Sequence, residues 1–162
     1  MKAGDYKRYI PYLVIMAGLI FFYYYRYRRV PDMEFSSLQV TQQDGNKVPL
    51  GNILGEKTVI HFYASWCGPC IREMKEIKEE WAHLESENIQ FIFITDDPED
   101  RIAPFRTQMP QDVLFLQIPS LQDAGIYTIP TSYFLKNRTI TTKHVDPMNW
   151  KNLQEINEQF NQ

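Results

Sequence analysis

The fold of this chain is limited most by a junction at which a strand-like run passes directly into a helix-like run. Residues 58–64 (TVIHFYA) are mostly β-branched or aromatic and form a run too short for a helix, which predicts a buried strand. Apolar residues then recur at spacings of three and four, which predicts an amphipathic helix, at Ile71, Met74, Ile77, Trp81 and Leu84. The motif Trp66-Cys67-Gly68-Pro69-Cys70 lies between the two, so the cysteine pair is expected where the helix begins.

The rest of the chain alternates between strand and helix patterns. A hairpin is expected from residues 34–40 and 47–50 with a turn at Asp44-Gly45. Capping signals at Asp97-Pro98 and Asp146-Pro147 predict two helices, one to about Gln108 and one with an apolar stripe at Trp150, Leu153, Ile156 and Phe160. Further elements are expected as strands at 89–95, 131–135 and 140–144, a turn at 136–138 and a short helix near 121–127. This alternation predicts an α/β layered fold.

Composition bounds the size and class of the protein. The chain has 162 residues, a net charge of −3 and only two cysteines. One compact domain plus an appendage is expected, and a two-domain enzyme with separate cofactor and substrate lobes is excluded. Two cysteines exclude a disulfide-dense scaffold and a four-cysteine metal site. The acidic total argues against nucleic acid as a partner.

The charge is unevenly distributed along the chain. Residues 1–33 carry six basic and two acidic side chains, a net charge of +4, whereas residues 34–162 carry 11 and 18, a net charge of −7. Residues 9–25 are uncharged and would form a helix of roughly 25 Å. We therefore expect residues 1–33 to be a membrane anchor and linker, with a transmembrane segment at about 9–25, followed by one domain at 34–162.

Two alternatives for the tail are a cleaved signal peptide and a buried core helix. Cleavage requires a small-x-small site after the apolar run, and this run ends in Tyr-Tyr-Tyr-Arg, which favours retention. Basic residues flank both ends of the run, so charge does not decide its orientation.

The cysteine pair carries the predicted chemistry. Unpaired backbone N–H groups and the helix dipole favour a thiolate over a thiol at Cys67, which is the expected nucleophile. Cys70 lies one helical turn further on and is expected to resolve a mixed disulfide formed on Cys67. Pro69 suits the first turn, because its missing N–H would have no partner there.

Other uses of the pair are weaker. A zinc half-site would need His61, His83 or His144, and none has finger-like spacing. A structural bridge across four residues removes little unfolded-state entropy. Peroxidase chemistry also uses a thiolate at a helix terminus, but a second cysteine three residues later favours dithiol exchange. We expect no metal and no cofactor other than a redox-active disulfide.

The segment VIHFYASWCGPCIREM, followed by a βα unit and residues 128–135 (TIPTSYFL), resembles the thioredoxin superfamily. The tail, the hairpin and an extra helical segment around 97–109 resemble the TlpA/ResA branch of membrane-tethered thiol-disulfide oxidoreductases. The resemblance covers residues 34–162. It implies a thioredoxin-like α/β fold, with a central mixed sheet flanked by helices, an N-terminal hairpin and a helical insertion, preceded by one transmembrane helix.

The resemblance also implies a substrate-binding surface. It predicts a cis Ile129–Pro130 bond beside the cysteine pair, where the backbone would meet an extended substrate peptide. Without the cysteine motif, an ordinary trans proline that opens a strand would explain the same residues. Trp66, Gly68 and Pro69 would complete the surface, although packing alone would also explain Trp66.

Two further residues are candidates for proton transfer. Glu73 follows Cys70 by three residues, and a glutamate at this spacing belongs to the active site in the ResA-like branch. His61 precedes Cys67 by six residues, where thioredoxins carry a buried aspartate and many TlpA-like relatives an asparagine, so it departs from the family pattern. It would accept a proton from Cys70 if neutral and stabilise a thiolate if charged. Alternatively, Glu73 is a solvated glutamate on the helix surface, and His61 is a hydrogen-bonded core histidine with no catalytic effect.

The expected function is reduction of disulfides in envelope proteins, because Gly-Pro between the cysteines is the dipeptide of reducing thioredoxins. The resemblance implies re-reduction by a membrane electron-donor protein and one substrate class, the haem-attachment cysteines of cytochrome c. The domain is expected at the bacterial cell membrane, single-pass, facing the periplasm or outer envelope, where disulfides persist. Open alternatives are a disulfide oxidant or isomerase of the same fold and a non-catalytic tethered binding module. The sequence predicts no oligomeric state.

Overall fold

The computed structural model describes residues 6–27 and 35–161. The chain divides into two compact units, Met1–Asp32 and Met33–Gln162. The expected linker around Val30 and Pro31, and the strand start at Glu34, lie outside the described residues. The first unit contains α1 (Tyr6–Tyr27).

Helix α1 covers the segment in which the sequence predicts a membrane span. Its side chains from 9 to 23 are exposed, and Pro11 lies inside the helix. Among the described residues, however, no helix is both long and apolar enough to cross a membrane. The uncharged run has only 17 residues, and tyrosine hydroxyls at both of its ends lower its hydropathy. The helix is confirmed, but the structure does not support the predicted span.

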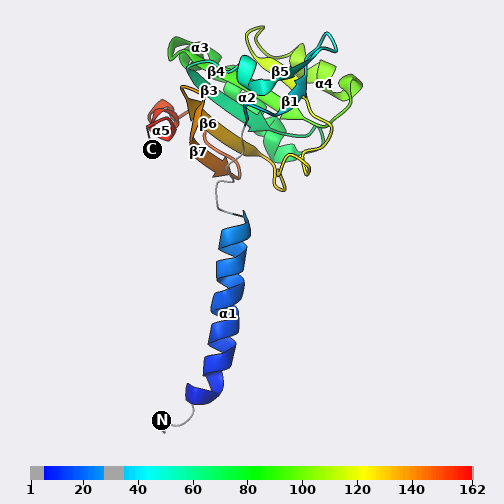
Figure 1. Ribbon diagram of the computed structural model, residues 1–162. Helices are drawn as coiled ribbons and strands as arrows, with labels where there is room; N and C mark the ends of the chain where they lie inside the picture. Colours follow the sequence, from blue (N-terminus) through cyan, green and yellow to red (C-terminus); the bar gives the residue numbers. More distant parts are fainter. Residues whose placement is uncertain (1–5, 28–34, 162) are drawn as a thin grey trace. The chain divides into compact units, whose positions relative to one another are not determined.

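The second unit is built on a seven-stranded mixed sheet, with the strand order β2-β1-β5-β4-β3-β6-β7 (Figure 1). Strand β3 is central: it runs parallel to β4 and antiparallel to β6. The described strands are β1 (Gln39–Thr41), β2 (Lys47–Pro49), β3 (Lys57–Phe62), β4 (Ile89–Thr95), β5 (Leu114–Gln117), β6 (Thr131–Lys136) and β7 (Thr139–Val145). The helices are η1 (Leu50–Asn52), α2 (Gly68–Glu79), α3 (Trp81–Ser86), α4 (Glu99–Arg106) and α5 (Leu153–Gln159).

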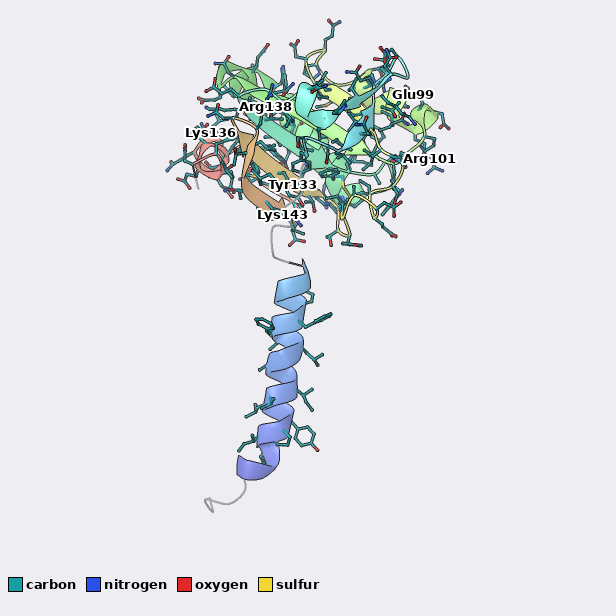
Figure 2. All side chains as sticks on the ribbon, in the orientation of Figure 1. Glu99, Arg101, Tyr133, Lys136, Arg138 and Lys143 are labelled. Carbon is teal, nitrogen blue, oxygen red and sulfur yellow. A yellow bond between two sulfur atoms is a disulfide. The ribbon has the colours of Figure 1, made fainter. Side chains whose placement is uncertain are left out.

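Side chains alternate between two cores along the central strands. Val59 of β3 and Phe91 of β4 belong to one apolar cluster, whereas the neighbouring Ile60 and Ile92 belong to the other. The first cluster contains the buried apolar residues of α2, α3, α4 and α5, together with both cysteines. The second is closed by η1 and by loop residues such as Phe35 and Leu121. At its margin, Lys143 on β7 lies over the ring of Tyr133 on β6, with Nζ 5.4 Å from the ring centre (Figure 2).

Most predicted elements form, but several differ in extent or type. The one helix expected from Ile71 to Leu84 is two helices, α2 and α3, and the first strand of the hairpin spans only Gln39–Thr41. The segment near 121–127 is a series of turns rather than a short helix. The helix after Asp97-Pro98 has Pro98 at its N-cap and no side-chain cap, because the Asp97 carboxylate binds elsewhere. The last helix begins at Leu153 with Asn152 as its N-cap, so Trp150 lies in the preceding loop. Strand β5 has no counterpart among the predicted elements.

Candidate active site

The disulfide Cys67–Cys70 lies at the junction between β3 and α2. Strand β3 is buried along most of its length and ends at Phe62, five residues before Cys67. Cys67 is the N-cap of α2, and its Sγ accepts a hydrogen bond of 3.2 Å from the backbone N–H of Cys70. In the reduced protein, the backbone N–H groups in the first turn of α2 would stabilise a thiolate on Cys67 in the same way.

The two cysteines are both buried but differ in their surroundings. Cys67 is 5% exposed and Cys70 is fully buried. Trp66 is 72% exposed and Gly68 is also exposed, so the motif opens to solvent on the side of Cys67. A substrate therefore reaches Cys67 first, which agrees with its expected role as the nucleophile.

An acidic side chain supports the loop before the motif. The Asp97 carboxylate, which is buried after β4, accepts hydrogen bonds from the backbone N–H of Ser65 and from the Thr95 hydroxyl. The sequence predicts Asp97 as the N-cap of a helix. The parallel pairing of β3 with β4 instead brings its carboxylate to the backbone N–H of Ser65. This contact fixes the backbone two residues before Cys67.

The predicted cis Ile129–Pro130 bond is present. The Pro130 carbonyl accepts a hydrogen bond of 3.2 Å from Asp146, and the Thr131 hydroxyl donates to the Thr128 carbonyl. Ile129 is half-buried and packs against the cluster that contains Cys67 and Cys70. Direct stacking of Pro130 on the disulfide stays a prediction.

Glu73 is buried, not solvated. Its side chain is 3% exposed, and Oε1 accepts two hydrogen bonds of 2.8 Å, from the backbone N–H of Met148 and from Nε1 of Trp150. Burial raises the pKa of Glu73 to about 7, although both hydrogen bonds lower it. Glu73 therefore changes its protonation state near neutral pH.

His61 faces Glu73 from β3. Its Nε2 lies 3.7 Å from Oε2 of Glu73, and neither atom has a hydrogen-bond partner among the described residues. Its Nδ1 is 2.8 Å from the Ser132 hydroxyl, which lies directly opposite on β6. Burial lowers the pKa of His61 to about 3, so the histidine is neutral and the two groups do not form an ion pair.

The structure thus brings Glu73 and His61 together and adds partners that the sequence analysis missed. Ser132 depends on the register of β3 with β6, and Met148 and Trp150 lie in the loop before α5. The sequence analysis predicted Trp150 as part of the apolar stripe of the last helix, and for this reason missed its role as a hydrogen-bond donor. Within the described residues, no cluster of potential metal ligands is present.

A mixed sheet, a Cys-X-X-Cys disulfide at a strand-to-helix junction and a cis proline before the adjacent antiparallel strand together define a thioredoxin-fold protein. The sequence profile described as the AhpC/TSA family matches residues 28–141. The chain belongs to this family, and it is a ResA-like thiol-disulfide oxidoreductase.

Known relatives agree with this assignment. The sporulation thiol-disulfide oxidoreductase A of Bacillus subtilis is 26% identical over 125 residues, which cover 72% of this chain and 74% of that protein. The thiol-disulfide oxidoreductase ResA of Bacillus cereus is 25% identical over 134 residues, 76% of this chain and 77% of that protein. A probable nucleoredoxin 1 of Arabidopsis thaliana is 30% identical over 73 residues, but this chain spans only 13% of its length.

The fold also matches solved structures. A thioredoxin-like protein from Porphyromonas gingivalis superimposes with a TM-score of 0.64 at 18% identity, over 78% of this chain and 90% of that one. This likeness confirms the thioredoxin-like fold.

The raised pKa of Glu73 predicts a specific pH dependence of stability. Between pH 4.5 and about 7 the folded protein holds a proton that the unfolded chain has lost, so ionisation of Glu73 destabilises the fold as the pH rises. The Glu73→Gln variant cannot ionise at this position, so it does not lose this stability as the pH rises. The unfolding free energy of the variant, relative to the wild type, should therefore rise by on the order of 3 kcal/mol across that window.

Urea unfolding of the oxidised protein at a series of pH values measures this difference. The proton uptake of His61, between about pH 3 and 6.5, is common to both proteins and cancels to first order. Glu79→Gln, at an exposed position on the same helix, is the matched control and should show no such rise. Parallel curves for the wild type and Glu73→Gln would contradict a raised pKa at Glu73.

Proposed function

We propose that this protein reduces disulfide bonds of proteins through the Cys67/Cys70 dithiol. The observation that carries the proposal is the disulfide at the N-terminus of α2, with Cys67 between the exposed Trp66 and Gly68 and with Cys70 fully buried. This asymmetry suits a two-step exchange in which only the outer sulfur meets the substrate.

The reaction balances without a further oxidant. In the reduced protein, the Cys67 thiolate attacks one sulfur of the substrate disulfide, and the other substrate sulfur leaves as a thiolate and takes a proton. The Cys70 thiolate then attacks Sγ of Cys67, which breaks the mixed disulfide and releases the second substrate thiol. The substrate gains two electrons and two protons, and the protein is left with the Cys67–Cys70 disulfide seen in the structure.

We propose that Glu73 accepts the proton of the Cys70 thiol and later releases it. Cys70 must lose a proton before it attacks, and the buried carboxylate on the next turn of the same helix is the titratable group at that face. Its pKa of about 7 lets it accept a proton at neutral pH and release it again. The neutral His61 faces the same carboxylate and leaves Cys70 without a neighbouring positive charge from that direction.

We propose the reducing direction over oxidation or isomerisation. The Gly68-Pro69 dipeptide is that of reducing thioredoxins, and His61, whose pKa is lowered by burial, does not supply a positive charge that would stabilise a thiolate. The dithiol itself carries the electrons, so a separate cofactor is not part of the proposal. A membrane electron-donor protein is proposed to restore the dithiol, and the haem-attachment cysteines of cytochrome c are a proposed substrate.

We further propose that the protein works at the bacterial cell membrane, with the catalytic domain facing the periplasm or outer envelope. Support comes from the uncharged run at residues 9–25, from the exposed apolar side chains of α1, and from the persistence of substrate disulfides in that compartment.

The exchange mechanism predicts that Cys70→Ala accumulates mixed disulfides. Without the resolving sulfur, the covalent intermediate on Cys67 cannot release its substrate. Non-reducing gels of cells that express the variant should show high-mass adducts that collapse with dithiothreitol. Cys67→Ser is the control and should form none. The absence of adducts from Cys70→Ala would refute exchange with protein substrates, and an unchanged cellular phenotype of Cys67→Ser would favour the binding-module alternative.

The direction of electron flow predicts the reduction potential. Equilibration of the purified full chain with thiol–disulfide buffers should give a value near that of thioredoxin, roughly −270 mV. A value near that of strong oxidants, roughly −120 mV, would reverse the proposed direction but leave the reaction class intact.

The proposed location predicts the outcome of fractionation. The full chain should sediment with membranes, and protease added to spheroplasts should remove its thioredoxin-like domain. A cytoplasmic protein serves as the protected control. Full protection of the domain would contradict an outward orientation.

A further inference from the structure

A groove of about 520 Å³ lies between α2 and the C-terminal end of α4. Its apolar residues are Ile71 and Met74 from α2, and Phe105 and Met109 from α4 and the residues that follow it. Phe105 and Met109 are half-buried and pack against the same cluster as the two cysteines. Ile71, directly after Cys70, is 39% exposed. The groove therefore begins beside the disulfide and offers an apolar floor.

The rim of the groove is basic. Arg72, Lys75 and Lys78 line it from α2, with Glu79 as its one acidic residue. Glu79 lies 3.9 Å from Lys75 and 3.7 Å from Lys151, so its charge is already shared by two lysines. Among the described residues, neither Arg72 nor Lys78 lies within ion-pair distance of a carboxylate.

Two nearby carboxylates, those of Glu99 and Glu73, face other partners. On α4, Arg106 forms a two-pronged salt bridge with Glu99, which is exposed and labelled in Figure 2, so that carboxylate is already paired. Glu73 of α2 is buried and points to His61. The rim is therefore locally positive, although residues 34–162 as a whole carry a net charge of −7.

We propose that this groove binds an acidic segment of the protein substrate that carries an apolar anchor residue. The inference rests on the proposed exchange with protein disulfides and adds the class of substrate. A chain joined to Cys67 places its neighbouring residues within reach of Ile71 and Arg72, since Arg72 already extends toward Gly68. An apolar side chain fits the floor, and carboxylates beside it meet Arg72 and Lys78.

Three synthetic disulfide peptides test the proposal. They share one apolar anchor and differ only in three flanking residues, which are Glu, Gln or Lys. The pre-reduced full chain should reduce the Glu peptide about tenfold faster than the Lys peptide at low salt, against the net charge of the domain. The difference should shrink at high ionic strength, because the rim is exposed to solvent. Equal rates for the Glu and Lys peptides would overturn the proposal.

Paired variants locate the effect. Arg72→Gln/Lys78→Gln should lower the Glu-to-Lys rate ratio about fivefold, and this ratio cancels any change in the intrinsic reactivity of Cys67. Lys47→Gln/Arg138→Gln removes two exposed cations from β2 and from the β6–β7 turn, and should leave the ratio unchanged (Arg138 is labelled in Figure 2). An equal drop in both double variants would show a general charge effect and would refute the groove.

A binding measurement separates this proposal from the proposed function. Methionine-methyl NMR of the full chain, titrated with a cysteine-free Glu peptide, should shift the signals of Met74 and Met109. If no disulfide peptide is reduced but these signals shift, the reducing function fails and the groove stands. Unshifted signals overturn the groove whatever the reduction rates, and so does a shift produced by raising the protein concentration alone, because a second copy would then occupy the site.

Discussion

The arrangement of the active site depends on the buried carboxylate of Glu73. One oxygen accepts hydrogen bonds from Met148 and Trp150 in the loop before α5, and the other faces His61 on β3. The side chain thereby joins the helix that carries the disulfide to the central strand and to the C-terminal segment. Trp150 in turn stacks on Phe134 and packs edge-on against Phe91, so the hydrogen bond is made within the main core. A change at Glu73 therefore affects chemistry and packing together.

Sequence patterns were sufficient where a single period or a local motif decides the structure. The strand at residues 89–95 follows from a short apolar run, and the hairpin turn follows from Asp44-Gly45, where the structure gives Gly45 a positive φ. The motif Cys67 to Cys70 also carries its own geometry, because a helix start and a two-residue spacing suffice to close the disulfide. The resemblance supplied the cis proline, which local patterns alone would have left open.

The misassigned residues are those whose partners are distant in sequence. Asp97 resembles a helix cap, but the Ser65 N–H competes for its carboxylate and lies 32 residues earlier. Trp150 fits an apolar stripe, but its indole N–H must be satisfied on burial, and Glu73 lies 77 residues away. In both cases the side chain takes a hydrogen-bond partner that is distant in sequence, and local periodicity does not predict such a contact.

The Ser132 hydroxyl explains how a buried histidine tolerates a glutamate that changes its charge. A hydroxyl can donate to Nδ1 of His61 or accept from it, whereas a side chain with only one of these functions could not. When Glu73 is ionised, the favoured tautomer carries its proton on Nε2, directed at Oε2, and Ser132 donates to Nδ1. When Glu73 is protonated, Nε2 is free to be the acceptor and Nδ1–H donates to Ser132. Burial lowers the pKa of His61 and raises that of Glu73, so both shifts favour a neutral imidazole with the proton of the site on the Glu73 carboxyl.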